Sequence, residues 1–235
     1  MKLALALVAF AVAACSSTAS EEDSRQDDPL RVLLLGDSIS IGYTPYVREE
    51  LAGEAVVVRP TLPNPNGTTR PENCEGTNKG VENLERWLAL EGGDWDVIHF
   101  NFGLHDLKRV APGTGKNSTD PRHPHQASPE RYERQLGQIV DRLRITGARL
   151  VFATTTPVPE GDLRPYREPA DAVEYNAVAR RVMERAGVTV NDLWSFVEQS
   201  GEPWLNVADV HFTEAGYEAL GNRVAGAVLA AARER

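Results

Sequence analysis

The sequence predicts an α/β fold built around a parallel sheet. Short apolar runs rich in β-branched residues alternate along the chain with longer amphipathic stretches, and this rhythm is typical of repeated strand, helix and strand units. The apolar runs are nearly continuous, as expected of strands that are buried on both faces of a sheet. With 235 residues, of which 41% are hydrophobic, the chain suits one domain with a sizeable core.

Five strands and five helices are expected in alternation. The strands are predicted at 31–35, 55–59, 96–100, 149–153 and 188–190. The helices are predicted at 39–51, 80–90, 129–146, 169–186 and 214–231. Ser128 and Thr213 are expected to cap the starts of the third and fifth helices, and Gly147 and Gly187 stand where the third and fourth helices should end.

Three long connections remain, at 60–79, 107–127 and 154–168. The first two follow the second and third strands, at the edge where open α/β sheets bind their ligands. Loops of this length usually carry function. We therefore expect the functional residues at the carboxyl ends of the strands.

The folded domain is expected at 30–235, after two segments of different composition. Residues 1–14 contain one lysine and a short apolar run, which is typical of a secretory signal peptide and too short to cross a bilayer core of ~30 Å. The segment Val12-Ala13-Ala14-Cys15 resembles the lipobox of bacterial lipoproteins, whose cysteine is lipidated after cleavage. Lipid on Cys15 implies anchoring to a membrane of the bacterial cell envelope, periplasmic or outer, and residues 15–29 have the polar composition of a flexible tether.

Charge and motif content exclude several classes of function. The chain carries 25 Lys and Arg against 34 Asp and Glu, a net charge of −9, so nucleic acid is not an expected partner. It contains neither GxGxxG nor GxxxxGK[ST], and no cofactor is expected. Asp120, His123 and His125 share one loop, but a zinc site needs three or four ligands in fixed geometry. No further ligand stands nearby in the sequence, so no metal site is expected.

Ser38 stands where the first predicted strand gives way to the first helix, in Gly36-Asp37-Ser38. The N–H groups of a helix N-terminus suit a nucleophile and the oxyanion formed beside it, although a serine at this point is equally suited to cap the helix. A serine nucleophile needs a base, most often a histidine held by a carboxylate. Asp209 and His211 lie two positions apart before the last helix, and in an extended segment their side chains point to the same side.

A further polar cluster, Gly103-Leu104-His105-Asp106, follows the third predicted strand. Together with Gly36-Asp37-Ser38, Asp209 and His211, this order resembles the SGNH/GDSL hydrolase family over nearly the whole domain. The resemblance implies a three-layer α/β/α sandwich with a flavodoxin-like parallel sheet of five strands. It also implies ester hydrolysis through an acyl-enzyme on Ser38, with His211 as the base.

The resemblance also assigns an oxyanion hole. The backbone N–H of Ser38 is expected to donate to the oxyanion. Asp37 and Gly103 are expected to support the residues that contact the substrate, without contacting it themselves. The glycine block of the family, which supplies a second backbone N–H, falls within Asn73-Cys74-Glu75-Gly76-Thr77. Gly76 is our choice, and the backbone of Cys74 competes with it.

Two positions depart from the family pattern. His105 stands where the family has an asparagine amide that stabilises the oxyanion. A neutral imidazole can donate one N–H to that oxygen, and Asn101 is the fallback donor. The family's aspartate three residues before the histidine is Ala208 here. Either Asp209 takes the role of the acid, or a backbone carbonyl orients the histidine.

The expected function is a serine esterase that hydrolyses short-chain esters, with O-acetyl groups on carbohydrate as the favoured substrate. An envelope location and polar loops without a large apolar stripe favour a glycan or small-molecule ester over a long-chain lipid. A thioesterase or a lysophospholipase is the alternative within enzymes. The two departures favour a non-catalytic glycan-binding protein, but the presence of both Ser38 and His211 opposes it.

Overall fold

Five parallel strands form the centre of the computed structural model, which describes residues 28–234. They are β1 (Leu30–Leu35), β2 (Ala55–Val58), β5 (Val97–Phe100), β6 (Arg149–Ala153) and β7 (Thr189–Asn191). Their spatial order is β2-β1-β5-β6-β7, the flavodoxin-like order, which confirms the predicted fold class. The expectations for the signal peptide at 1–14, for Cys15 and for most of the tether lie outside the described residues.

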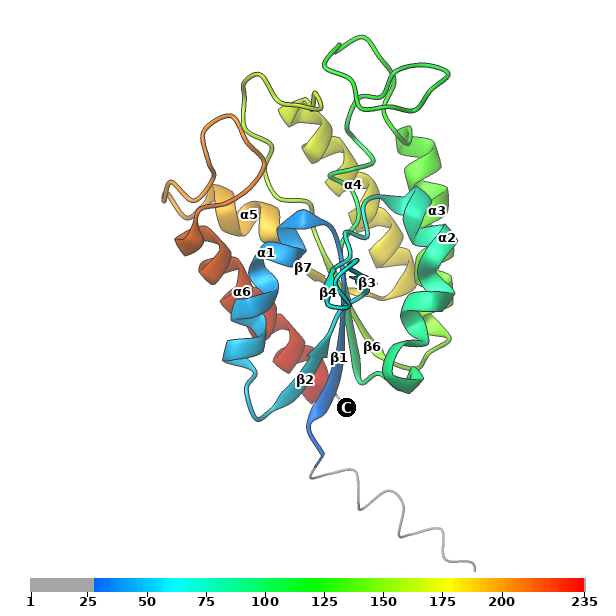
Figure 1. Ribbon diagram of the computed structural model, residues 1–235, viewed down its shortest axis with the longest axis vertical. Coiled ribbons are helices and arrows are strands. Elements are labelled where there is room, and N and C mark those ends of the chain that lie inside the picture. The colour runs from blue at the N-terminus through cyan, green and yellow to red at the C-terminus, as the bar shows by residue number, and fades with distance from the viewer. Residues whose placement is uncertain (1–27, 235) are drawn as a thin grey trace, which may run out of the picture.

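Helices cover both faces of the sheet and make the three layers seen in Figure 1. On one face α1 (Ser38–Glu50) packs against α6 (Glu214–Arg233), and the short α5 (Leu193–Glu198) lies on the same side. On the other face α3 (Pro129–Arg144) packs between α2 (Thr77–Leu88) and α4 (Pro169–Ala186). Because both faces are covered, the central strands β1 and β5 are buried along nearly their whole length.

The helix ends follow the capping signals. The Ser128 hydroxyl accepts the N–H of Arg131 at the start of α3, and Thr213 accepts the N–H of Gly216 at the start of α6, as predicted. Gly187 is the residue at the end of α4 and adopts a left-handed conformation with φ of 67°, which glycine tolerates without a steric cost.

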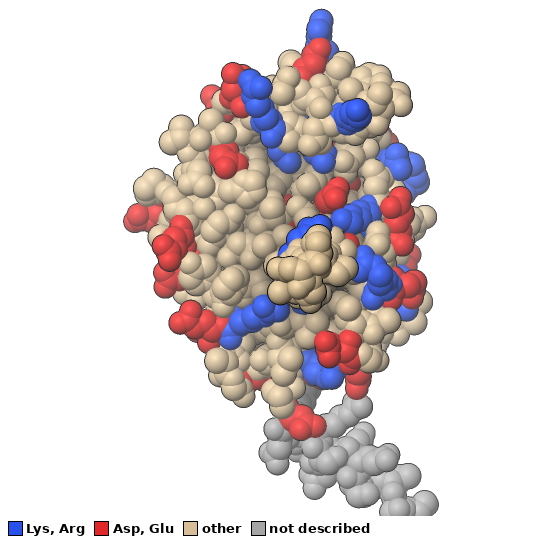
Figure 2. Space-filling view, in the orientation of Figure 1, with Lys and Arg blue, Asp and Glu red and all other residues tan. Residues whose placement is uncertain are grey.

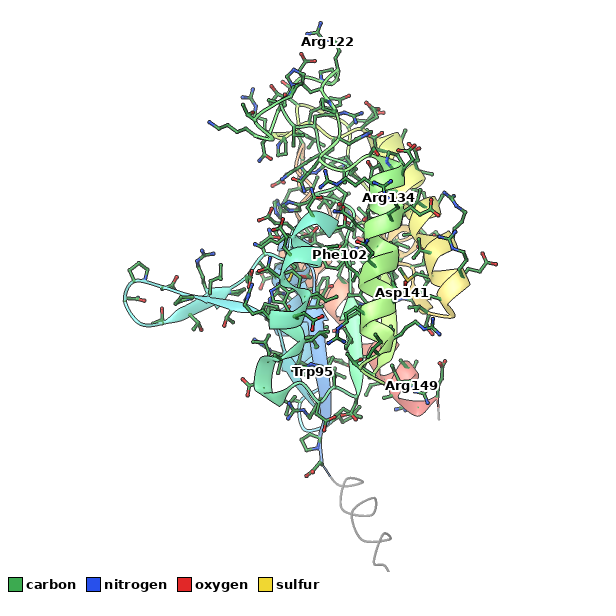
Figure 3. The ribbon with its side chains drawn as sticks, turned by 90° about the vertical axis from the view of Figure 1, so that its right-hand side faces the viewer. Trp95, Phe102, Arg122, Arg134, Asp141 and Arg149 are labelled. Carbon is green, nitrogen blue, oxygen red and sulfur yellow. The ribbon has the colours of Figure 1, made fainter. Side chains whose placement is uncertain are left out.

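The predicted loop at 60–79 is partly ordered as a hairpin. β3 (Thr61–Pro63) and β4 (Thr69–Pro71) pair antiparallel, and Figure 3 shows this hairpin extending away from the body of the domain. α2 then begins at Thr77, three residues before the predicted start, and ends at Leu88, followed by the 3₁₀ turn η2 (Leu90–Gly92). The hairpin and α5 were not predicted, because strands of three residues and a helix of six carry too little periodicity to detect.

The long loops gather at the carboxyl edge of the sheet. In Figure 1 the loops at 107–127, 154–168 and 199–213 lie at the end of the domain where α1 begins. The chain enters the domain at the opposite edge, beside the amino end of β1. Within residues 28–234, no helix is long and apolar enough to cross a membrane.

Candidate active site

The turn between β1 and α1 presents the hydroxyl of Ser38. Ser38 is the first residue of α1, and the helix is capped by the preceding Asp37, whose carboxylate accepts the N–H of Ile39 at 2.9 Å. The alternative that Ser38 serves as the cap is therefore wrong. The Ser38 hydroxyl instead lies 2.9 Å from Nε2 of His211, which comes from the loop before α6.

A buried arginine, Arg59, stabilises the turn between β1 and α1 through hydrogen bonds. The Arg59 guanidinium donates to the hydroxyls of Ser40 and Thr44 at 3.2 and 2.8 Å. It also donates to the carbonyls of Gly36 and Glu72 at 3.4 and 3.0 Å. Arg59 is 4% exposed, so these four contacts replace the water that the charge would otherwise keep. They fix the backbone on both sides of Ser38.

Asp209 orients the base. Its Oδ1 lies 2.8 Å from Nδ1 of His211 and also accepts the backbone N–H of His211 at 3.2 Å. Burial raises the pKa of Asp209, but the hydrogen bonds from His211 outweigh this effect and hold the pKa below its usual value. Of the two alternatives for orienting the histidine, the structure shows the carboxylate.

The local backbone at Asp209 is bent, where the sequence argument assumed an extended segment. Ala208 adopts a left-handed conformation with φ of 51°, and the N–H of Asp209 returns to the carbonyl of Asn206 at 3.3 Å. The carboxylate reaches His211 through this turn. The spacing of two residues was thus informative, but for a different geometric reason.

Two backbone N–H groups at the starts of α1 and α2 have no partner in the described part of the chain, and of the two residues Ser38 lines the cleft whereas Gly76 is buried beside it. Among residues 28–234, neither the N–H of Ser38 nor that of Gly76 has a hydrogen-bond partner. Cys74 is not equivalent to Gly76, because its N–H donates to the carbonyl of Gly36 at 3.1 Å, so the fallback on the Cys74 backbone is wrong. That bond ties the segment before α2 to the turn that carries Ser38.

His105 presents a side-chain donor in the same cleft. Its Nδ1 lies 3.2 Å from Nζ of Lys108. A lysine ammonium can only donate, so Nδ1 accepts and we assign the ring proton to Nε2. Burial, reinforced by Lys108 and Arg167, lowers the pKa of His105 to about 3. The imidazole is therefore neutral at physiological pH, with an N–H at Nε2.

Asp106 positions these donors relative to one another. It is fully buried, and its Oδ1 accepts the N–H of Thr77 at 2.9 Å and the Thr77 hydroxyl at 2.6 Å. A β-carbon on Gly76 would lie 2.8 Å from both carboxylate oxygens, so only glycine fits there. Burial raises the pKa of Asp106 to about 6, although hydrogen bonds from Thr77 oppose the rise. The loop after β5 is thereby joined to the start of α2.

The family of the chain can now be stated. Residues 34–219 match the model of the GDSL-like Lipase/Acylhydrolase family. The chain belongs to this family. It is therefore an acylhydrolase of the carboxylic ester hydrolase type, and the predicted family and enzyme class are confirmed at that level.

Solved structures of similar fold agree with this assignment. The acetyl xylan esterase AlAXEase is 14% identical, with a TM-score of 0.61, over 85% of this chain and all of that one. The lipase/acylhydrolase from Enterococcus faecalis is 20% identical, with a TM-score of 0.63, over 85% of this chain and 95% of that one. A GDSL-like lipase from Bacteroides thetaiotaomicron is 12% identical, with a TM-score of 0.62, over 89% and 95%. At such identities the likeness concerns the fold. No curated protein matches the sequence.

Two predicted support residues lie outside the cleft of the acylhydrolase. A β-carbon on Gly103 would lie 2.1 Å from Oγ1 of Thr155, so this glycine permits close packing of two loops. The amide of Asn101 donates to the carbonyl of Ala153 at 2.8 Å and does not line the cleft. Asn101 therefore joins β5 to β6, and its role as a fallback donor is wrong.

The cleft of the acylhydrolase has a volume of about 710 Å³. Ser38, His105 and His211 line it together with Asn73, Asp162, Leu163, Arg164, Pro165, Arg167, Val207, Ala208, Asp209 and Val210. Sequence reasoning missed Arg167, which stands in the long loop before α4 and carries no motif. It also assigned no role to Asp106, whose contact with Thr77 joins segments 29 positions apart in the sequence.

The histidines of the loop at 107–127 contact different groups. Nδ1 of His123 lies 2.7 Å from the Ser118 hydroxyl, and Nε2 of His125 lies 2.9 Å from the carboxylate of Asp171 in α4. Within residues 28–234, no three His, Cys, Asp or Glu side chains are placed to hold a metal ion. Cys74 is a buried free thiol, and burial raises its pKa to about 12, so it is a poor nucleophile.

Proposed function

We propose that this acylhydrolase is a serine esterase that removes short acyl groups, above all O-acetyl groups, from carbohydrate. The observation that carries the proposal is the hydrogen-bonded chain from the Ser38 hydroxyl through His211 to Asp209, with distances of 2.9 and 2.8 Å. All three of these residues line the cleft. A hydroxyl, a base and an orienting carboxylate in that order form the recurring arrangement for acyl transfer through serine.

The geometry supports a two-step mechanism. Oγ of Ser38 attacks the ester carbonyl carbon while Nε2 of His211 takes the hydroxyl proton, and Asp209 stabilises the imidazolium. His211 then returns the proton to the leaving alcohol oxygen as the carbon–oxygen bond breaks, which leaves an acyl group on Ser38. Water attacks this acyl-enzyme with His211 again as the base. The carboxylic acid leaves, and the serine hydroxyl is restored.

The oxyanion of both tetrahedral intermediates is held by three donors. They are the open N–H groups of Ser38 and Gly76 and the Nε2–H of His105. Each preorganised donor contributes ~2.7–4 kcal/mol in related sites. Because the imidazole of His105 is neutral, it supplies a dipole where the family's asparagine supplies an amide dipole. The departure at this position therefore leaves the number of donors unchanged.

The character of the cleft supports a polar substrate. His105, Arg164 and Arg167 line it beside apolar residues such as Leu163 and Val207, so donors for sugar hydroxyls are present in a cleft of mixed polarity. A structurally similar protein is named as an acetyl xylan esterase. Thioesterases and lysophospholipases of this kind act on longer acyl chains, so chain-length preference separates these alternatives.

We also propose that lipid on Cys15 anchors the enzyme to the bacterial cell envelope, in the periplasm or at the outer membrane. The domain begins at the amino edge of the sheet, opposite the end at which α1 begins (Figure 1), and Ser38 at that start lines the cleft. A tether attached there leaves the cleft facing away from the membrane. In Cys15→Ser, we expect the protein to lose its partition into the membrane fraction, and unchanged partition would refute the anchor.

The test of the activity uses a chain that starts at Asp27, with p-nitrophenyl acetate, butyrate and octanoate as substrates. We expect turnover to be highest on acetate and to disappear in Ser38→Ala. Acetylated polysaccharide is then the substrate of choice for release of acetate. Preference for octanoate would favour the thioesterase or lysophospholipase alternative. If wild type and variant were equally inert on all three esters and on acetylated polysaccharide, the protein would be a binding protein.

A further inference from the structure

Arg167 places an unneutralised guanidinium in the wall of the cleft. The residue is 7% exposed, in the loop that leads into α4. Its Nε donates to the carbonyl of Leu104 at 2.9 Å, and its Nη1 donates to the carbonyl of Pro165 at 3.4 Å. Within residues 28–234 it forms no ion pair, and Nη2 has no partner. Two of its five N–H groups are thus used, both on neutral carbonyls, and three remain.

Two other arginines, the buried Arg59 and the partly buried Arg109, have more oxygen contacts or an ion pair, although Nε of each has no partner within residues 28–234. Arg59 meets four oxygen acceptors, and Nη2 of Arg109 pairs with the carboxylate of Asp171 at 3.0 Å. A buried charge is costly unless hydrogen bonds and an opposite charge compensate it. Like Arg59, Arg167 forms no ion pair within residues 28–234, but unlike Arg59 it has only two hydrogen-bond acceptors and it lines the cleft. The unused N–H groups of Arg167 are therefore candidates to donate hydrogen bonds to a ligand in the cleft.

The two carboxylates that act electrostatically on Arg167 already have hydrogen-bond partners. Asp37 and Asp209 act on it electrostatically, but neither forms an ion pair with it. Asp37 caps α1, and Asp209 bonds to His211. Burial lowers the pKa of Arg167 to about 10, so the side chain is cationic at neutral pH.

We propose that Arg167 binds a carboxylate that the substrate carries on its alcohol side, so that the enzyme prefers O-acyl esters of acidic carbohydrate, such as uronates. The inference rests on the proposed function and names its substrate class more closely. Planar guanidinium donors match the two oxygens of a carboxylate. Ser38 and Arg167 line the same cleft, so the ester and the carboxylate of one substrate are both placed there. Basic and acidic side chains both occur over the face in Figure 2.

The test compares two esters of equal size, 3-acetoxybenzoate and 3-acetoxybenzamide, with the full-length protein. We expect kcat/KM to be at least about tenfold higher for the carboxylate, with the difference mainly in KM, because anion binding acts equally in the ground and transition states. In Arg167→Gln the preference should be lost while the amide is hydrolysed within about threefold of wild type. Arg167→Lys should keep part of the preference, because it keeps the charge.

Arg122→Gln is the matched control. The Arg122 side chain is 87% exposed and lies at the far tip of the domain, as Figure 3 shows. Arg122→Gln removes one positive charge outside the cleft and should leave the rates on 3-acetoxybenzoate and 3-acetoxybenzamide unchanged. If Arg167→Gln lowered both rates equally, Arg167 would only position the loop at Leu104, and the proposal would be overturned. Equal rates of wild type on the two esters would overturn it as well.

Two further measurements separate this inference from the proposed function. Binding of 3-hydroxybenzoate and 3-hydroxybenzamide to Ser38→Ala, with and without Arg167→Gln, reports on the anion site without catalysis. If wild type is inert on both esters but carboxylate binding depends on Arg167, the esterase proposal fails and the anion site stands. If binding shows no such dependence, the anion site fails. Mono-p-nitrophenyl succinate places the carboxylate on the acyl side. Its kcat/KM relative to p-nitrophenyl acetate is compared with that of 3-acetoxybenzoate relative to 3-acetoxybenzamide. If the first ratio were the larger, the assignment of the carboxylate to the alcohol side would be overturned.

Discussion

Two helices begin beside Ser38, and they are capped in opposite ways. α1 is capped from within its own sequence, by the carboxylate of the preceding Asp37. α2 follows Gly76, which has no side chain to cap with, and receives the carboxylate of Asp106 from 29 positions along the chain. The local cap leaves the Ser38 hydroxyl available to His211. The remote cap leaves the Gly76 N–H open and fixes the loop that carries His105.

The two helix starts at this edge of the sheet have different roles in the proposed reaction. The start of α1 supplies the nucleophile, and its cap comes from a neighbour in sequence, while Arg59 and the N–H of Cys74 hold the preceding turn. The start of α2 supplies oxyanion donors, and its geometry depends on a contact between distant loops. Changes at the first site should therefore separate chemistry from stability, whereas changes at the second should affect both.

The largest effect is expected at the start of α1. Ser38→Ala removes the nucleophile, and we expect kcat to fall by at least ~10⁴-fold. Because Asp37 caps the helix, the free energy of unfolding should change by no more than about 0.5 kcal/mol. Ester turnover and urea denaturation measure the two quantities. Full turnover by Ser38→Ala, or a large loss of stability, would contradict this division.

The next effect concerns the side-chain donor beside α2. His105→Ala should lower kcat by ~10²–10³-fold with a smaller change in KM, because an oxyanion contact acts in the transition state. His105→Asn restores an N–H donor and should retain kcat within about tenfold of wild type. Steady-state kinetics on p-nitrophenyl acetate give the comparison. A change in KM alone would make His105 a substrate-binding residue.

A direct comparison of the two caps should give a smaller effect on stability. Asp106→Ala leaves the N–H of Thr77 without its buried acceptor, whereas the Thr77 hydroxyl keeps Oε1 of Gln135 at 2.9 Å, and we expect a loss of about 1–3 kcal/mol in the free energy of unfolding. Asp37→Ala should lose about 1 kcal/mol, the usual contribution of an N-cap. Asp106→Asn keeps an acceptor oxygen and serves as the control. Equal losses at the two positions would show that the remote cap carries no extra contacts.

The last comparison concerns the pH dependence of stability. The pKa of His105 is lowered to about 3 in the folded state against ~6.5 when unfolded. The unfolded chain thus binds the extra proton between these values, and stability falls as pH falls below ~6.5, by at most about 1.4 kcal/mol per pH unit. His105→Asn should flatten this slope between pH 4 and 6 in thermal or denaturant unfolding. An unchanged slope would mean that His105 is protonated in the folded protein.

Much of the fold was readable from the sequence because its signals are local. The apolar runs located all five strands of the sheet to within a residue or two, and the caps at Ser128 and Thr213 marked two helix starts. The start of α2 was misplaced because its cap comes from Asp106. A contact between loops distant in sequence leaves no trace in the residues around either end.

The candidate site divides in the same way. Ser38, Asp209 and His211 stood out because their residue types and spacing carry a chemical pattern, and the structure brings all three within hydrogen-bond distance. The tautomer of His105 depends on its contact with Lys108. The unpaired charge of Arg167 depends on the absence of an ion-pair partner among the described residues that line the cleft. Neither could be predicted from sequence, because each is a property of packed neighbours.

The central claim is that His211 activates Ser38 as a nucleophile, and covalent trapping tests it most directly. The protein is treated with diisopropyl fluorophosphate and analysed by intact mass and peptide mapping. We predict one adduct, on Ser38, in wild type and none in Ser38→Ala, with labelling strongly slowed in His211→Ala. An unlabelled wild type, or an adduct on another residue, would contradict the account.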